Sequence, residues 1–308
     1  MKKIWIFVCL LLVLVGCQSI KEKPLVLTPD GIPSIALGGL YDEDVFDVSV
    51  VTGVDLITSQ LVLNDYDFIV APITAGAKLY MNQQSSYKLA AVLTLGNTFV
   101  FAKGEASLES IYDLEGKRIV AYGRNNTPDI VLQHALNTHD VSAEVVYEAS
   151  VQDVLSNRIS ANDDSEYFLL AEPVLSTVLH KLNIEGSVLD LQDVLNEDIP
   201  SICQAGLFVK SDAKQVESIL HHIESNITEI NDNAQNYVTK LLNKDKVKFP
   251  SFSNLGNDVL VQSIPRSHIV FFRAKEAKED IITFFNVINE YNPEILGGTI
   301  PSDSFYFE

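Results

Sequence analysis

The sequence predicts a two-lobed α/β fold with a cleft between the lobes. Short apolar runs typical of strands alternate with stretches typical of amphipathic helices along most of the chain. The alternation falls into two blocks, at 24–98 and 104–203, and the last third is mostly helical. Alternating strands and helices favour mainly parallel sheets with helices on both faces. Each block therefore predicts one lobe.

The first block opens with strands and helices that follow one another closely. Two prolines and a glycine between residues 29 and 33 end the first strand in a rigid turn. Pro72 ends the third strand, and the stretch after it is typical of the opening of a helix. The expected strands are 24–28, 48–51, 68–71 and 89–95, and the expected helices are 34–40, 54–64 and 74–81.

The second block repeats the pattern, and the final third departs from it. The block has expected strands at 99–103, 118–122, 143–147 and 167–171, and helices at 108–114, 128–136, 151–159 and 173–182. After it come one strand at 205–210 and helices at 213–243, 254–262 and 275–291. Since the final third has no sheet of its own, we expect it to pack on the first block.

This arrangement makes the chain cross twice between the lobes. The crossings are expected near 98–103 and 204–209, and two crossing strands make a hinge. Lobe 1 is then 24–98 together with 204–308, and lobe 2 is 99–203. Ligands of open α/β sheets bind beyond the carboxyl ends of the strands. Both lobes would turn those ends towards the cleft.

The first residues are typical of an export signal. Lys2 and Lys3 precede an apolar run too short to span a membrane comfortably, so 1–16 is predicted to be a signal peptide. The run ends in Leu-Val-Gly-Cys, which is similar to the box at which bacterial lipoproteins are cleaved and acylated. Cys17 is therefore the predicted lipid anchor, and 17–23 a lipidated tether on the outer side of the membrane. The alternative is an uncleaved anchor with an incidental cysteine.

Composition excludes several classes of protein. Lysine and arginine number 22 against 41 acidic residues, a net charge of −19, which argues against a nucleic-acid partner. Cys203 is the single cysteine after the lipid site, so no internal disulfide is expected. The six histidines show no metal-binding spacing, and the chain has no phosphate-binding loop and no Gly-x-Ser-x-Gly. We therefore expect no metal, no cofactor and no catalytic residues.

Polar residues follow several of the predicted strands, where a cleft ligand would lie. Free backbone N–H groups at a helix start suit an anion, and Arg124 stands beside one such start. Glu172 follows a strand and is expected to accept from an amine or N–H group. The polar residues after each strand also have a purely structural interpretation, in which they cap a helix or form a turn. In that interpretation Glu172 offsets the helix dipole. The candidate ligand contacts are Thr28, Asp30, Pro33, Ile73, Thr74, Ala75, Arg124, Asn125, Asn126, Thr127 and Glu172.

Several short motifs occur together in an order that resembles one family. They are TPDGIP at 28–33, FIVAP at 68–72 with Lys78-Leu79-Tyr80 after it, Gly96-Asn97, LEGK at 114–117, TPD at 127–129, AEP at 171–173, IPR at 264–266, and Gly297-Gly298 through Phe305-Tyr306. Together they resemble the substrate-binding lipoproteins of bacterial ABC importers, in the nitrate/sulfonate/taurine-like group that is distantly related to thiamine-precursor binders. The resemblance covers essentially the whole mature chain.

The resemblance implies a fold and a function. It implies the type II periplasmic-binding-protein fold in a monomeric receptor that closes on a small-molecule solute and delivers it to ABC permease subunits. It also adds Asn97 and Gln204 to the expected ligand contacts. The strict anion signature of sulfonate and nitrate members is missing, so an anionic and a heteroaromatic solute both stay open. A receptor of the same fold that senses without transport, and an enzyme on this fold, are the alternatives.

Overall fold

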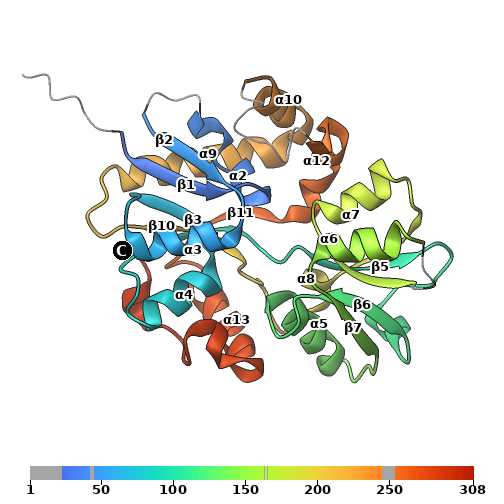
Figure 1. Ribbon diagram of the computed structural model, residues 1–308. Coiled ribbons are helices and arrows are strands. Elements are labelled where there is room, and N and C mark those ends of the chain that lie inside the picture. Colours follow the sequence, from blue (N-terminus) through green and yellow to red (C-terminus); the bar gives the residue numbers. More distant parts are fainter. Residues whose placement is uncertain (1–22, 42–44, 163, 165, 245–253) are drawn as a thin grey trace, which may run out of the picture.

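The computed structural model describes residues 23–41, 45–162, 164, 166–244 and 254–308. It shows two mixed sheets, each covered by helices, that lie side by side as two lobes (Figure 1). The predicted signal peptide, Cys17 and nearly all of the tether lie outside the described residues. Within the described part of the chain, no helix is long and apolar enough to cross a membrane.

The sheet of lobe 1 has six strands in the order β11-β4-β10-β3-β1-β2. The strands β1, β2 and β3 pair in parallel, and β10 pairs antiparallel with both β3 and β4. Their apolar runs are buried because helices cover both faces of the sheet. The strands are β1 (Leu25–Pro29), β2 (Asp47–Val51), β3 (Phe68–Pro72), β4 (Lys88–Thr94), β10 (Ala205–Val209) and β11 (Ile269–Arg273).

The sheet of lobe 2 has five strands in the order β7-β6-β8-β5-β9. Here β6 pairs in parallel with β7 and β8, whereas β5 is antiparallel to β8 and β9. The strands are β5 (Thr98–Lys103), β6 (Arg118–Tyr122), β7 (Glu144–Glu148), β8 (Tyr167–Ala171) and β9 (Gly186–Asp190).

The strands β5 and β10 are antiparallel to both of their neighbours for a topological reason. Each begins directly after a segment in which the chain passes from one sheet to the other, at 95–97 and 195–204. A strand that enters its sheet from the other lobe starts where its neighbours end. The carboxyl ends of β1, β3 and β4 therefore meet the start of β10 at one edge of lobe 1.

Helices cover both faces of each sheet. Apolar side chains of α9, α10 and α12 pack on one face of the first sheet, and those of α3, α4 and α13 on the other. The helices of lobe 1 are α2 (Ile32–Ile35), α3 (Val54–Leu63), α4 (Ile73–Met81), α9 (Val216–Asp232), α10 (Ala234–Lys244), α12 (Asn257–Ser263) and α13 (Lys278–Tyr291). Lobe 2 has α5 (Thr127–Thr138), α6 (Val151–Asp153), α7 (Val174–Ser176) and α8 (Leu191–Val194), with π-helical turns at Val154–Ile159 and Thr177–Lys181. Short 3₁₀ helices lie at Gly38–Tyr41, Ile111–Leu114, Pro265–Ser267, Pro293–Leu296 and Asp303–Phe305.

The structure corrects the expected elements in three places. The strands β9 and β11 were not expected, and β11 shows that the final third adds an edge strand to the first sheet. The single helix expected over 213–243 is two helices, because the chain turns at Asn233. The Asn233 side-chain oxygen accepts a hydrogen bond from Asn236 N (2.9 Å) and so caps the start of α10.

Candidate ligand-binding cleft

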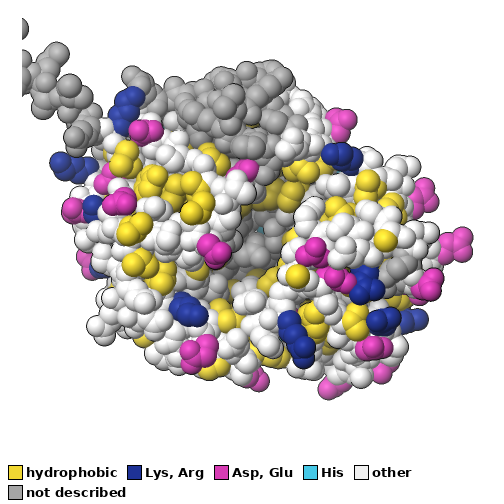
Figure 2. Space-filling view, in the orientation of Figure 1, with side chains coloured by type: hydrophobic (Ala, Val, Ile, Leu, Met, Phe, Trp, Pro, Cys, Tyr) yellow, Lys and Arg dark blue, Asp and Glu magenta, His cyan; other side chains and the backbone are white. Residues whose placement is uncertain are grey.

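A cavity of about 750 Å³ lies between the two lobes. Figure 2 shows this face of the molecule hollowed between the two halves. The cavity adjoins the carboxyl ends of β1, β3 and β4, the start of β10 and the start of α5. Strand ends of lobe 1 and a helix start of lobe 2 therefore face each other across one space, as ligand sites of α/β sheets require.

One wall of the cavity is the end of β3 and the start of α4. Pro72 fixes the exit of the chain from the sheet, and α4 begins directly after it. The N–H of Ile73 donates to the carbonyl of Gln204 (2.9 Å), which ties the helix start to the second crossing segment. Thr74 and Ala75, in the first turn, line the cavity.

Two carboxylates lie on the lobe 1 side. Asp30 follows β1, where its N–H donates to the carbonyl of Val51 (2.8 Å). The turn continues through Gly31, whose φ of +148° favours glycine. Asp55 lies in the first turn of α3 and is exposed, whereas Asp30 is half-buried. Both side chains belong to the lining of the cavity.

Lobe 2 contributes a short surface, the start of α5. Asn126, Thr127 and Pro128 line the cavity there. Directly behind them the carboxylate of Asp129 is buried, and it accepts hydrogen bonds from Asn125 N (2.7 Å) and from Tyr147 Oη (2.7 Å). The first turn of α5 therefore carries its own negative charge.

The crossing segments and α13 close the back of the cavity. Asn97 lies in the first crossing, and Cys203 and Gln204 lie at the end of the second. The N–H of Gln204 donates to the carbonyl of Thr94 (3.0 Å), and Phe284 of α13 completes the apolar floor. Burial raises the pKa of the Cys203 thiol to about 12, so the thiol is protonated at neutral pH.

The lobes touch on one side of the cleft through α5 and α13. The Asn137 side-chain amide donates to Tyr291 Oη (2.8 Å), and the Asn292 amide donates to the carbonyl of Asn125 (3.0 Å). His134 of α5 hydrogen-bonds Asp198 and packs edge-on against the Tyr291 ring.

The lobes also touch on the other side. There α12 packs on α7, and His268 Nε2 lies 3.2 Å from Asp190 Oδ2. The lobes are therefore in contact on both sides of the cavity.

Comparisons with known proteins were made for sequence and for structure. No model of a known protein family matches this chain, and a search of curated proteins found no match. Solved structures do match over nearly the full length. An ABC transporter protein from Parabacteroides distasonis is 21% identical, with a TM-score of 0.77, over 93% of this chain and 99% of the other.

Two further solved structures match less closely in sequence. The periplasmic aliphatic sulphonate binding protein SsuA from Escherichia coli is 11% identical, with a TM-score of 0.67, over 93% of this chain and 92% of the other. The ligand binding component of an ABC-type import system from Staphylococcus aureus, with zinc bound, is 15% identical, with a TM-score of 0.66, over 94% and 97%. This chain has the two-lobed type II periplasmic-binding-protein fold. The fold class expected from the sequence is confirmed.

Most of the ligand contacts expected from the sequence line the cleft of this type II fold. They come from five separate stretches of chain, which the fold brings together although they span more than half of the sequence. The expected residues found in the lining are Asp30, Pro33, Thr74, Ala75, Asn97, Asn126, Thr127 and Gln204.

Five of the expected contacts lie outside the lining, Glu172 among them. Thr28 and Ile73 are fully buried in lobe 1, one residue behind the surface of the cleft. Arg124 lies over the ring of Tyr147, 5.3 Å from its centroid, and the carbonyl of Asn125 accepts from Asn292, directly after α13. Arg124 is therefore not positioned as the anion contact that its place beside α5 suggested.

Glu172 is also outside the lining, and its surroundings give it a different role. Its side chain is buried and accepts from Ser176 N (3.1 Å) and Ser176 Oγ (2.9 Å), and Arg266 Nη1 lies 3.9 Å away. Burial raises its pKa to about 7, and these partners oppose that rise. The structure thus holds this carboxyl group between α7 and the segment after α12, outside the lining of the cavity.

Sequence reasoning missed several lining residues. Asp55 follows β2 at the start of α3, so the rule that found the other corners would also have found it. Ile57 and Phe284 have no local signal, because only tertiary packing brings their helices to the cleft.

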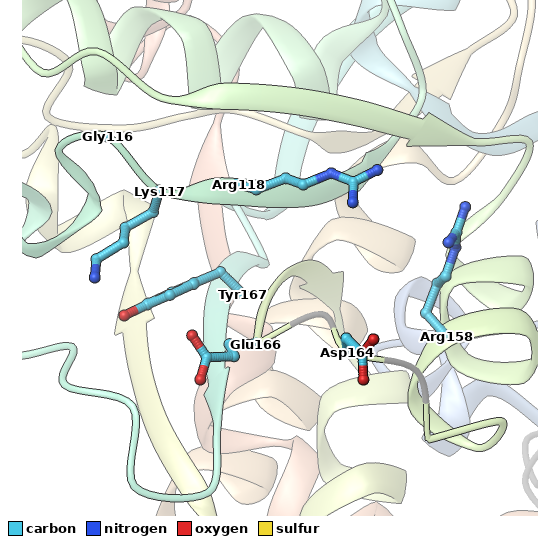
Figure 3. A pocket seen from close by; sticks show the side chains of 7 residues that line it. All are labelled: Gly116, Lys117, Arg118, Arg158, Asp164, Glu166 and Tyr167. Atoms are coloured by element: carbon cyan, nitrogen blue, oxygen red, sulfur yellow. The ribbon is translucent and has the colours of Figure 1, made fainter.

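A second cavity, of about 410 Å³, lies at the amino ends of β6 and β8. Figure 3 shows Lys117, Arg118 and Arg158 around it. Arg158 Nε pairs with Glu148 Oε1 (2.6 Å), Arg118 is 3.8 Å from Glu144, and Lys117 lies over the Tyr167 ring. These cations already have partners, so the cleft is the stronger candidate site. In the described part of the chain, no group of three or more His, Cys, Asp and Glu side chains is placed to hold a metal ion.

Proposed function

We propose that this protein is the solute receptor of an ABC importer, which captures a small organic solute between its lobes and delivers it to permease subunits. The observation that carries the proposal is the cavity of about 750 Å³ at the strand ends of lobe 1 and the start of α5, with the lobes in contact on both sides of it. Solved structures of the same fold include binding components of ABC import systems.

Capture follows from the division of the cavity between lobes. A solute that contacts both walls binds the closed form more tightly than the open form, and its binding shifts the equilibrium towards closure. The segments 95–97 and 195–204, which join the sheets, are the places where the chain would bend.

The side chains that line the cavity fit a protein that binds a solute without reacting with it. Cys203 is the one thiol among the described lining residues, and burial keeps it protonated. No histidine is among the described residues that line the cavity, so Cys203 has no imidazole base there. These observations favour a receptor over an enzyme.

The location and the assembly state are part of the same proposal. We infer that 1–16 is removed on export, that Cys17 is acylated, and that the lipid holds a monomeric receptor on the extracytoplasmic face of the membrane. Lobe 1 as 24–98 with 204–308, and lobe 2 as 99–203, are the proposed boundaries. Globomycin treatment of cells and mass spectrometry of the mature amino terminus test the lipid; an unmodified Cys17 in the mature protein would contradict it.

The receptor function is tested by a nutrient screen with the soluble chain from residue 18. We expect at least one small solute to raise the Tm, and small-angle X-ray scattering with that solute to show a smaller radius of gyration than without it. The absence of any stabilising solute would contradict the receptor function.

A further inference from the structure

We propose that His268 and Asp190 form a pH-dependent latch between the lobes, in which protonated His268 holds the lobes in contact and its deprotonation favours opening. His268 directly precedes β11 of the first sheet, and Asp190 ends β9 of the second sheet. The Nε2 atom of His268 lies 3.2 Å from Oδ2 of Asp190. The inference goes beyond the proposed receptor function, because it concerns how the lobes are held together with or without a solute.

Both ring nitrogens of His268 face oxygen atoms that accept hydrogen bonds. Nδ1 hydrogen-bonds the carbonyl of Gly96, in the first crossing segment, and Nε2 faces the carboxylate of Asp190. A neutral imidazole carries a hydrogen on one of its two nitrogens, whereas the imidazolium carries one on each. The imidazolium is therefore the form that can donate to both oxygens. Loss of its proton removes either the hydrogen bond to Asp190 of lobe 2 or the one to Gly96.

The same two residues are tied to both crossing segments. The carbonyl of His268 accepts from Leu95 N (3.0 Å) of the first segment. On the other side, Asp190 Oδ1 accepts from Gln192 N (2.9 Å), and Gln192 Oε1 accepts from Ile202 N (2.9 Å) of the second segment. Because the lobes open by bending these segments, we expect opening to separate His268 from Asp190.

The groups around the His268 ring determine the sign of the effect. The hydrogen bond to Asp190 raises the pKa of His268 most, the carbonyl of Gly96 and the charge of Asp193 on α8 add to the rise, and burial opposes it. The closed form therefore binds a proton more tightly than an open form without the Asp190 contact. Closure is favoured as the pH falls, and this bias is lost as the pH rises through the pKa of the closed form.

A second charged pair at the junction titrates in the opposite sense. Arg266, two residues before His268, lies 3.9 Å from Glu172 of lobe 2. Burial raises the pKa of Glu172 to about 7, so this carboxyl group ionises over the same range, and its attraction to Arg266 then grows. The expected net change is therefore modest. The ratio of closed to open protein should fall about two- to fivefold between about pH 5.5 and pH 8.5.

The test is energy transfer between fluorophores on S59C and Q152C, in the soluble chain from residue 18 without any solute. Both positions are exposed, one on α3 of lobe 1 and the other on α6 of lobe 2 (Figure 1), whereas Cys203 is fully buried. The transfer efficiency should fall as the pH rises, and H268Q should abolish this fall. D190N should abolish it as well, and it keeps a side-chain oxygen that can cap α8 if H268Q fails to fold.

The matched control is H134Q, on the other side of the cleft. His134 also pairs with an aspartate, Asp198, through Nε2, and a neutral imidazole can still donate that one hydrogen bond. H134Q and E172Q should both keep the fall in transfer efficiency. A transfer efficiency that does not fall with pH, an equal fall in H268Q, or a fall that disappears in E172Q would overturn the inference. Each of these results leaves the receptor function standing, because the nutrient screen tests that function and this measurement uses no solute.

Discussion

The two lobes face the same cavity with unequal surfaces. Lobe 1 supplies the ends of three strands, the first turns of α3 and α4, Phe284 and both carboxylates, whereas lobe 2 supplies the short start of α5. Lobe 1 can therefore hold most of a solute by itself, and lobe 2 adds the contacts that favour closure. The difference predicts an order of events, in which the open receptor binds solute on lobe 1 and then closes.

A large side chain placed in the cavity from lobe 1 or from lobe 2 should have the largest effect. It should separate solute binding by lobe 1 from closure by lobe 2. A75W places an indole on the wall of lobe 1 and is expected to weaken solute binding about a hundredfold. T127W makes the matched change on lobe 2 and is expected to cost about tenfold or less, because that lobe can stay partly open. Calorimetry of both variants checks the ratio, and equal losses would contradict the unequal division.

Removal of the buried carboxyl group of lobe 2 should affect stability and leave binding unchanged. The pKa of Glu172, about 7 in the folded chain, exceeds its usual 4.5, so its contribution to stability is full below about pH 4.5 and is lost as the pH rises through 7. E172Q is therefore expected to be more stable than the natural chain at pH 8, by about 1–2 kcal/mol, and to lose that advantage at pH 5.

Denaturant titrations at both pH values measure this effect, with E185Q, an exposed glutamate of the same lobe, as the control. A tenfold loss of solute affinity in E172Q would show that Glu172 contacts the solute, and would contradict its position outside the cavity lining.

The contact at the rim of the cleft should influence closure more than capture. N292A removes the hydrogen bond from the residue directly after α13, in lobe 1, to the carbonyl of Asn125. Affinity is expected to fall about two- to tenfold, and scattering with solute should show a larger radius of gyration than for the natural chain. A variant that binds less tightly but closes to the same extent would assign Asn292 to capture.

The smallest expected effect concerns the junction between the lobes. The hydrogen bond to Asp190 raises the pKa of His268 above its usual 6.5, with Asp193 and the carbonyl of Gly96 adding to the rise. The protonated form is the one stabilised, so its contribution is full below about pH 6.5 and is lost as pH rises through the folded pKa. H268Q should flatten the decline in the free energy of unfolding above pH 6.5, by less than about 1 kcal/mol, whereas H221Q, at an exposed position of α9, should not. Denaturant titrations across this pH range measure the effect.

The sequence predicted the corners of the cleft better than the sheets. Pro72 and the turn at 29–33 are local signals, because proline and glycine restrict the backbone wherever they occur. The edge strands β9 and β11 were missed because pairing with β5 and β4, far away in the sequence, makes them strands.

The electrostatics of the site show the same limit. The sequence placed Arg124 beside a helix start and so kept an anionic solute open, but it could not show the Tyr147 ring beneath the guanidinium. Which side chains share a cavity is a tertiary property, and Arg124 is not among the residues that line this one.

The crystal structure of the protein with the best hit of the nutrient screen tests the central claim most directly. The account predicts closed lobes with the solute between them, in contact with the first turn of α4 on lobe 1 and with the start of α5 on lobe 2. A solute that contacts one lobe alone, or one bound outside this cleft, would contradict it.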